Sequence, residues 1–291
     1  MDIRQLRHFV MVAETLHFGQ AAERLHMTQP PLSQSILMLE RELGAPLFAR
    51  TKRRVALTPF GAQWLEQVRP AIAAIDALPD AARQLREGRA GHLALSFVST
   101  ADYSVLPALV RRYAALFPQV EIRLTEATSD VQIPALLAGQ AHAGILIPPA
   151  DAPLPPDLCY RRLIREPLVA ALPEQWVEAG AIDAAAIVSL PLILFPRAVA
   201  PAFHDLVTGY YAVRGAQANI VQQAIQMQTI ISLVSAGLGI ALVPASLRNL
   251  ARAGVVYADL GDPPMLETGL AWRREDETPT LRQFLELAQG A

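Results

Sequence analysis

Apolar side chains recur at helical spacing through the first 45 residues and predict three short helices. The first begins at a capping box of Asp2 and Gln5 and has four apolar residues on one face: Leu6, Phe9, Val10 and Ala13. The second covers about Gly19 to His26. The third begins at Pro30 and Pro31, which a first helical turn tolerates, and ends at Gly44. Its apolar stripe is Leu32, Ile36, Leu39 and Leu43.

A hairpin and a long helix are predicted next. The runs LFAR and VALT flank Thr51-Lys52-Arg53-Arg54, which predicts a two-stranded wing with a cationic tip. Thr58 and Pro59 then supply the start of a helix that extends to about Glu87. Pro70 and Pro79 are expected to bend or break it. Its apolar residues alternate by three and four, as in a coiled-coil seam that needs a partner helix: Leu65, Val68, Ile72 and Ile75.

From His92 the pattern alternates between strands and helices, which predicts an α/β body. Gly88 to Gly91 is the expected hinge into it, and the proline-rich stretch Pro148 to Pro156 is a candidate crossing between two subdomains. Strands are predicted at 92–98, 120–126, 143–147, 168–172, 190–195, 218–222, 239–243, 255–260 and 268–273. Helices are predicted at 106–117, 131–137, 201–213, 229–236 and 280–288.

Composition narrows the class of protein. With 291 residues, of which 52% are hydrophobic and 18% charged, the chain is long enough for about two domains and too apolar to be disordered. One cysteine, Cys159, excludes an intramolecular disulfide. Charges interrupt every apolar run near the N-terminus, and the uncharged stretch between Arg214 and Arg248 contains several glutamines and glycines. We therefore expect a cytoplasmic protein without a signal peptide or a membrane span.

The charges are distributed unevenly. The first 60 residues carry eight basic and five acidic side chains, whereas the remainder carries 17 basic and 22 acidic ones. We call the first 60 residues the head and the remainder the body. A basic head joined to an acidic body is typical of a protein in which one module approaches phosphates and the other has a different function. Sequence motifs of nucleotide, serine-hydrolase and zinc-protease sites are absent, and the histidines have no metal spacing, so we predict no enzyme, metal or cofactor.

Three segments resemble the LysR-type transcriptional regulators. AAERLHMTQPPLSQSILMLERELGAPLFART is similar to their winged helix-turn-helix, LTPFGAQWLEQV to their linker helix, and VSAGLGIALVPASL to part of their effector domain. Shorter segments, STADYSVLPAL, TEATSDVQIPALLAG and LFPRAVAPAF, most resemble the branch that responds to muconates and other aromatic-degradation products.

The resemblance implies a domain organisation. Residues 1–58 would form a winged helix-turn-helix and residues 59–87 a dimerisation helix. Residues 88–291 would form a bilobal α/β effector domain like that of periplasmic binding proteins. Its subdomain I would cover about 92–161 and 266–291, and its subdomain II about 162–265.

Residues suited to DNA binding cluster in the head. A helix that enters the major groove must present short polar side chains at its N-terminal end, and a basic wing can hold phosphates. The alternative is that the former cap a turn and the latter form a solvated loop. The candidates are Gln29, Pro30, Pro31, Ser33 and Gln34 on the helix, and Arg50, Lys52, Arg53 and Arg54 in the wing.

Candidate effector-binding residues follow strand ends in the body, where helix N-termini favour an anion. In the resembling branch this cleft holds a small carboxylate, and the matching positions are Ser99, Thr128, Arg197, Pro201 and Phe203. Thr100, Gln132 and Met227 are added from the local pattern. Each candidate also has a purely structural alternative. The hydroxyl residues can cap helices, Arg197 can be an exposed loop charge, Gln132 can be solvated on a helix face, and Met227 can belong to the core.

One position departs from the family pattern. His142 stands where the family commonly has an acidic residue, and it is expected either to be a core histidine or to change the polarity of the cleft.

The predicted function is therefore a regulator that binds an interrupted palindromic promoter site. It would pair as dimers through the linker and again as a tetramer, and would change transcription by RNA polymerase when a small organic acid binds. The main alternative is a solute-binding sensor of the periplasmic-binding-protein type that does not read DNA sequence, and the basic head argues against it. A third possibility, an architectural DNA-binding protein without a ligand, would leave the cleft without a purpose.

Overall fold

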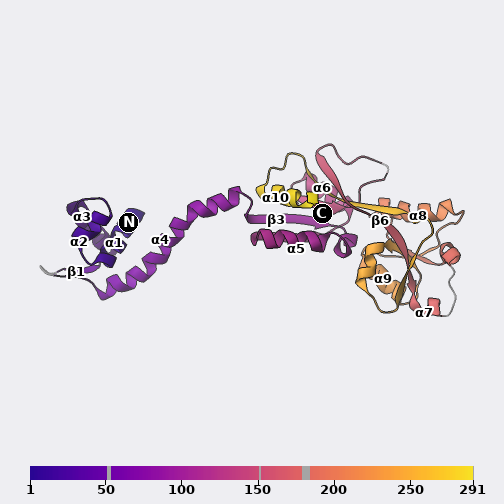
Figure 1. Ribbon diagram of the computed structural model, residues 1–291, viewed down its shortest axis with the longest axis horizontal. Helices are drawn as coiled ribbons and strands as arrows, with labels where there is room; N and C mark the ends of the chain where they lie inside the picture. The colour runs from indigo at the N-terminus through magenta and orange to yellow at the C-terminus, as the bar shows by residue number, and fades with distance from the viewer. Residues whose placement is uncertain (51–53, 151, 179–183, 291) are drawn as a thin grey trace. The chain divides into compact units, whose positions relative to one another are not determined.

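The computed structural model describes residues 1–50, 54–150, 152–178 and 184–290. The chain divides into two compact units, Met1–Arg83 and Gln84–Ala291 (Figure 1). Each unit has its own core, and the predicted fold class, a helix-turn-helix head followed by a bilobal α/β body, is confirmed.

The first unit contains the three predicted short helices and the wing. The helices are α1 (Ile3–Thr15), α2 (Phe18–Arg24) and α3 (Gln29–Leu43), and the antiparallel wing strands are β1 (Phe48–Arg50) and β2 (Val55–Leu57). The capping box of α1 is confirmed, because Asp2 and Gln5 exchange two hydrogen bonds of 2.8 Å. Gly44 ends α3 with a φ of +69°, a conformation that favours glycine. The apolar stripe of α3 is buried in the core of the unit, beside Phe9 of α1.

A single long helix, α4 (Pro59–Arg86), follows the wing. Of the seam predicted to need a partner helix, Leu65, Val68 and Ile72 instead pack against the core of the first unit, and only Ile75 is exposed. Thr58 caps α4 as predicted, since its Oγ1 accepts a hydrogen bond of 2.9 Å from the Gly61 N–H. Of the two effects expected of Pro70 and Pro79, a bend or a break, the break is wrong, because α4 continues through both. Each proline removes one N–H donor, and the hydrogen bonds of the neighbouring residues are enough to hold the helix together.

Gly61 lies where α4 passes closest to the wing. A Cβ atom at this position would lie 2.1 Å from the Leu47 carbonyl oxygen, whereas a Cβ at Gly209 would meet nothing within 4 Å. We expect Gly61→Ala to lower the free energy of unfolding by about 1–3 kcal/mol. The control, Gly209→Ala, should raise it by about 0.5–1 kcal/mol, because alanine is the better helix former. Urea titration measures both, and equal effects would show that the close approach is unimportant.

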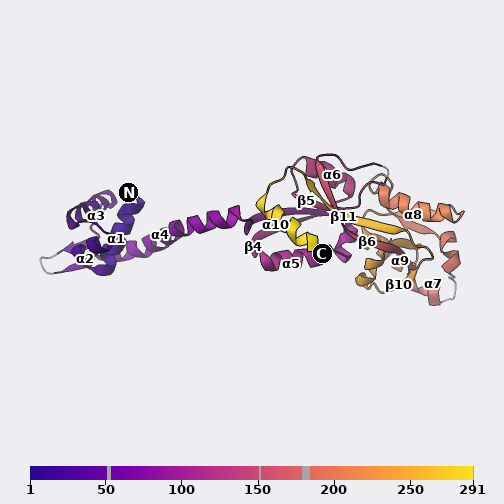
Figure 2. The same ribbon diagram turned by 45° about the horizontal axis from the view of Figure 1, so that its top comes forward.

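The second unit is built on a mixed seven-stranded sheet (Figure 2). The strand order is β10-β6-β11-β5-β3-β4, with β9 also paired to β6; β3 runs parallel to β4 and β5, and the other pairs are antiparallel. The strands are β3 (Ala90–Phe97), β4 (Gln119–Glu126), β5 (Ala143–Leu146), β6 (Leu158–Pro173), β9 (Ala241–Pro244), β10 (Val255–Asp259) and β11 (Met265–Arg273).

Helices cover both lobes of this unit. In the first lobe, α5 (Leu106–Leu116) and α10 (Pro279–Leu287) contact each other and the sheet, and α6 (Ser129–Leu137) packs on β5 and β3. In the second lobe, α9 (Met227–Ser235) packs on β6 and on a two-stranded parallel sheet of β7 (Leu192–Leu194) and β8 (Ile220–Gln223). The remaining elements are η1 (Ser99–Tyr103), α7 (Glu174–Glu178), η2 (Ala184–Ser189), α8 (Pro201–Val213), η3 (Ala245–Leu250) and η4 (Ala288–Gly290).

The crossing between the lobes differs from the prediction. The first part of β6, up to Pro167, pairs with β11, and from Leu168 onwards β6 pairs with β9 and β10. One long strand therefore passes from lobe to lobe. Of the predicted crossing, Pro148 to Pro156, the described residues precede this strand, and Leu154 packs in the first lobe. The prediction found only the apolar end of β6, because charged residues interrupt the apolar pattern of its first part.

The uncharged stretch between Arg214 and Arg248 contains β8, α9 and β9, as expected for α/β core. Among the described helices, none combines the length and the apolar character needed to cross a membrane.

Candidate functional site

The N-terminal end of α3 presents a polar and proline-rich surface. The turn that leads into α3 contains His26 with a φ of +55°, and Thr28 is the N-cap residue. Leu32 and Ile36 anchor the opposite side of the helix in the core. Four of the five predicted DNA-reading residues of α3 are exposed, and Ser33 is half-buried; the exposed ones are Gln29, Pro30, Pro31 and Gln34. Such a surface has the side-chain types and the helix position that major-groove readout requires.

The wing is held against α3 by one carboxylate. Glu40 Oε1 accepts hydrogen bonds from the N–H groups of Leu47 (2.9 Å) and Phe48 (3.1 Å), while Oε2 pairs with Arg50 Nη2 at 2.9 Å. The Arg50 guanidinium also lies 4.9 Å from the ring centre of Phe18. Arg50 thus helps to hold the wing against α3 and α2. Because its Nη2 donates to Glu40, fewer of its N–H groups are available to a phosphate than the sequence suggested. Arg54 is exposed before β2, and Lys52 and Arg53 lie outside the described residues.

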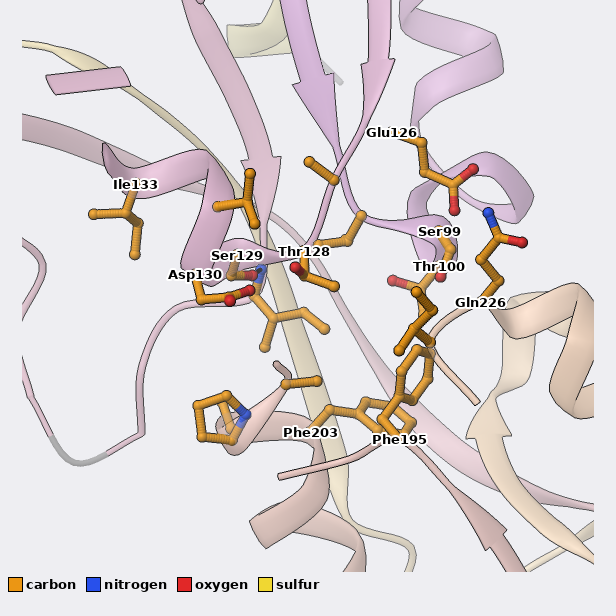
Figure 3. A pocket seen from close by; sticks show the side chains of 18 of the residues that line it. Ser99, Thr100, Glu126, Thr128, Ser129, Asp130, Ile133, Phe195, Phe203 and Gln226 are labelled. Atoms are coloured by element: carbon orange, nitrogen blue, oxygen red, sulfur yellow. Dashed lines mark hydrogen bonds between the residues drawn. The ribbon is translucent and has the colours of Figure 1, made fainter. Parts of the chain in front are cut away.

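A pocket of about 450 Å³ lies in the second unit, where the two lobes meet (Figure 3). Five predicted effector-binding residues line it: Ser99, Thr100, Thr128, Pro201 and Phe203. The first two follow β3 in η1, Thr128 follows β4 at the start of α6, and the last two begin α8. The carboxyl ends of two parallel strands and the N-terminal ends of helices therefore converge on one space, as in other α/β folds.

Hydroxyl groups form one wall of the pocket and aromatic rings the other. Thr128 is the N-cap residue of α6, yet its side chain makes no capping hydrogen bond. The Thr100 side chain is 4% exposed, and its Oγ1 has no hydrogen-bond partner within the described part of the chain. Opposite them, the rings of Phe195 and Phe203 pack edge to face with centres 5.3 Å apart. The pocket can thus offer hydrogen bonds to a polar head group and an apolar surface to the rest of a ligand.

The charges around the pocket are acidic. Glu126 and Asp130 line it, and none of the described lining residues is lysine, arginine or histidine. Burial raises the pKa of the Glu126 carboxyl, and the nearby Asp102 carboxylate raises it further. Burial also raises the pKa of Asp102. The pocket therefore lacks the cationic side chain that the sequence analysis expected there.

Three predicted residues lie elsewhere. Gln132 is fully buried, with Nε2 donating to the carbonyl oxygens of Ala127 (2.8 Å) and Ile145 (3.2 Å), so its amide holds α6 to the sheet. Met227 does not line the pocket; it is fully buried in the core of the second lobe and lines a small side cavity that adjoins the pocket. Arg197 is exposed and does not line the pocket, because its Nε and Nη2 donate to the two carboxylate oxygens of Asp205 at 2.8 and 2.7 Å.

The pairing of Arg197 with Asp205 makes a testable prediction. Hydrogen bonds from Arg197 and His204 lower the pKa of the Asp205 carboxyl to about 2. The ionised pair stabilises the folded chain above about pH 4, the ordinary pKa of aspartate, and this contribution is lost as the pH falls towards 2. Arg197→Ala should raise the pKa of Asp205 towards 3.8 and make stability less dependent on pH in that range. Carboxyl NMR titration measures the shift, and an unchanged pKa would contradict the assignment.

His142 lies away from the pocket. Its Nδ1 accepts a hydrogen bond of 3.0 Å from the Ala94 N–H, and its own N–H donates to the Ala94 carbonyl oxygen at 2.9 Å. Burial lowers the pKa of the half-buried ring. His142 thus hydrogen-bonds to the backbone of β3 just before β5 begins. It does not line the pocket, so it does not change the polarity of the lining.

Most of the residues that line the pocket were not predicted, and three of these lie at the ends of strands or helices. Glu126 is the last residue of β4, Phe195 directly follows β7, and Gln226 directly precedes α9. Their positions could have indicated them, because residues at the carboxyl ends of strands and the amino ends of helices face the ligand space of such folds. In the sequence, that rule was used to select only the hydroxyl residues.

Two family models match the chain, one for each unit of the structure. Residues 3–62 match the bacterial regulatory helix-turn-helix protein, lysR family, and residues 86–291 match the LysR substrate binding domain. The chain belongs to the LysR family of transcriptional regulators. The helix-turn-helix match removes the support for a solute-binding protein without a DNA-reading module.

This LysR-type regulator has relatives over almost its whole length. It is 69% identical over 287 residues to the HTH-type transcriptional regulator IlvR of Caulobacter vibrioides, which covers 99% of this chain and 97% of that one. It is 36% identical over 291 residues to the regulator AlsR of Bacillus subtilis, with 99% and 95% covered.

Solved LysR-type structures support the fold and the DNA-binding role. The crystal structure of CbnR, a LysR family transcriptional regulator, matches with 29% identity and a TM-score of 0.79, covering 99% of this chain and all of that one. Full-length CbnR complexed with its target DNA matches with 28% identity and a TM-score of 0.80, covering 100% and 99%. This LysR-type regulator is a DNA-binding transcriptional regulator.

Proposed function

We propose that the regulator reads an interrupted palindromic promoter site with α3 and changes transcription when a small organic acid occupies the pocket. The observation that carries the effector role is Thr100, which lines the pocket and whose buried hydroxyl has no hydrogen-bond partner among the described residues. An unpaired buried hydroxyl destabilises a fold, and a ligand that accepts its hydrogen bond relieves that penalty. Thr128 and the N-terminus of α6 lie beside it and also favour a carboxylate.

The lining favours a monocarboxylate with an apolar body. Phe195 and Phe203 offer a surface for an aliphatic or aromatic group. The resemblance to the muconate-responding branch suggests a dicarboxylate as the alternative effector. A second carboxylate would lie near Glu126 or Asp130 without a basic lining residue to offset the repulsion, so the charges give the dicarboxylate less support.

The exposed apolar residues of α4 support assembly with a second copy of the chain. Ile75, Leu78 and Leu85 are 41%, 61% and 55% exposed, and they recur along the helix at intervals of three and seven residues. Such a stripe is typical of a coiled-coil seam. A dimer through α4 would place two copies of α3 on two half-sites, and a further pairing would give a tetramer.

In the proposed mechanism the effector draws the two lobes together around the pocket. Closure changes how the DNA-reading helices of the assembly are spaced, relaxes a bend in the promoter DNA and alters access of RNA polymerase. Measuring DNA bending by fluorescence energy transfer, with the full chain on a site it protects from nuclease, tests this mechanism. We expect at least one small monocarboxylate to change the bend. An identical bend across a saturating panel would contradict it.

A further inference from the structure

A small side cavity of about 60 Å³ adjoins the pocket and has an acidic lining. Ser99, Glu126 and Gln226 line both spaces. The residues that line the side cavity only are Asp102, Tyr103, Met227 and Gln228. Its volume matches one or two water molecules or one small polar group. Figure 3 shows the side-chain ends of Glu126 and Gln226 facing each other beside Ser99.

The two carboxylates of the side cavity have no cation near them. Neither Asp102 nor Glu126 forms an ion pair within the described part of the chain, and no described lining residue of either space is basic. Burial and mutual repulsion raise the pKa of Glu126. Two neighbouring carboxylates without a counter-charge repel each other, and a bound cation would stabilise them.

A second, independent feature points to a ligand in the adjoining pocket. Thr100 is 4% exposed, and its Oγ1 has no hydrogen-bond partner in the described part of the chain; the residue follows Ser99 in η1 and lines the pocket but not the side cavity (Figure 3). A carboxylate beside Thr100 and Ser99 would therefore lie next to the acidic side cavity, because Ser99 lines both spaces.

Building on the proposed function, we propose that the effector carries an ammonium group as well as a carboxylate, with the ammonium bound by Glu126 and Asp102 in the side cavity. The ligand class is an α-amino acid with an apolar side chain. Its two charged groups share one carbon, which suits two adjoining spaces that share Ser99, and its side chain lies towards Phe195 and Phe203. The ammonium supplies the missing cation and forms charge-assisted hydrogen bonds.

The test compares ligands that differ only in the amino group. L-valine, L-leucine and L-phenylalanine are paired with isovalerate, isocaproate and hydrocinnamate, and binding to the full chain is measured by calorimetry and thermal melting. We expect at least one amino acid to bind about 10- to 100-fold more tightly than its partner acid, as for loss of a charged hydrogen bond. In Glu126→Gln, the preference should fall close to equality.

Two variants control for location and fold. Glu121→Gln changes the same residue type on the same strand outside the pocket, and it should keep the preference. Asp130→Asn changes the other lining carboxylate, and it should keep the preference as well. If Asp130→Asn removes the preference and Glu126→Gln does not, the proposed place of the ammonium is wrong. Glu126 is exposed and makes no ion pair in the described part of the chain, and Glu126→Gln removes its repulsion with Asp102, so the variant should melt at the same temperature or slightly higher.

The outcomes separate the two proposals. If the acids bind and change the DNA bend while the amino acids bind no better, the carboxylate effector stands and the ammonium site is overturned. If neither class binds, both proposals fail.

Discussion

Replacing Gln34 by alanine is expected to remove about 1–3 kcal/mol of discrimination at particular base pairs of each half-site. Gln34 is exposed near the N-terminal end of α3, where an amide can make two hydrogen bonds to one base edge. The expected result is a loss of affinity on the preferred sequence and a smaller loss on sequences changed at the contacted position. Affinities measured on a set of single-base variants of the site, at fixed salt, give this difference.

Two control variants separate base-specific recognition from sequence-independent binding to the phosphates. Gln67→Ala makes the same change on an exposed position of α4 and should leave both affinity and discrimination unchanged. Arg54→Ala, beside the wing, should weaken binding to all sequences alike and make affinity less dependent on salt. If Gln34→Ala also weakened every sequence by the same factor, α3 would be a phosphate contact and the division of roles would be wrong.

Replacing Thr100 by valine is expected to stabilise the free protein and to weaken effector binding at the same time. Valine has nearly the shape of threonine and lacks the buried, unpartnered hydroxyl, so the free energy of unfolding should rise by about 1 kcal/mol or more. Loss of a hydrogen bond to a carboxylate should weaken binding by about tenfold or more. Urea titration and calorimetry with the amino acids and organic acids of the paired panel measure the two effects.

Thr280→Val is the matched control for this prediction. Thr280 is as deeply buried as Thr100, but its Oγ1 donates to the His92 carbonyl oxygen at 2.8 Å. The same substitution should therefore destabilise the fold and leave ligand binding unchanged. A loss of stability in Thr100→Val would show that the hydroxyl is paired in solution, and unchanged binding would remove it from the site.

The sequence was sufficient to predict the head because its helices each bury one apolar face. Phe9, Leu32 and Ile36 follow the helical period, and Asp2 and Gly44 mark helix ends by local chemistry. It was insufficient for α4, where the packing of Val68 in the core and the capping by Thr58 stabilise a helix that contains two prolines.

In the body, local pattern predicted strands with an apolar run and missed the first part of β6, whose pairing with β11 depends on residues about a hundred positions away. The pocket hydroxyls could be predicted from their position after strands. The burial of the Gln132 amide and the pairing of Arg197 with Asp205 could not be predicted in this way. Both depend on tertiary contacts, which a short sequence motif does not indicate. The acidic character of the pocket followed only once Glu126 and Asp130 were placed on it.

Reading of a specific promoter sequence by α3, under the control of the pocket, can be measured on genomic DNA. Sheared genomic fragments are recovered with the full chain over a series of salt concentrations and then sequenced. We expect one or a few intergenic palindromes to survive moderate salt, and the effector to change protection of those sites. Salt-sensitive recovery of all fragments alike would contradict this expectation, because the head would then hold DNA without reading its sequence.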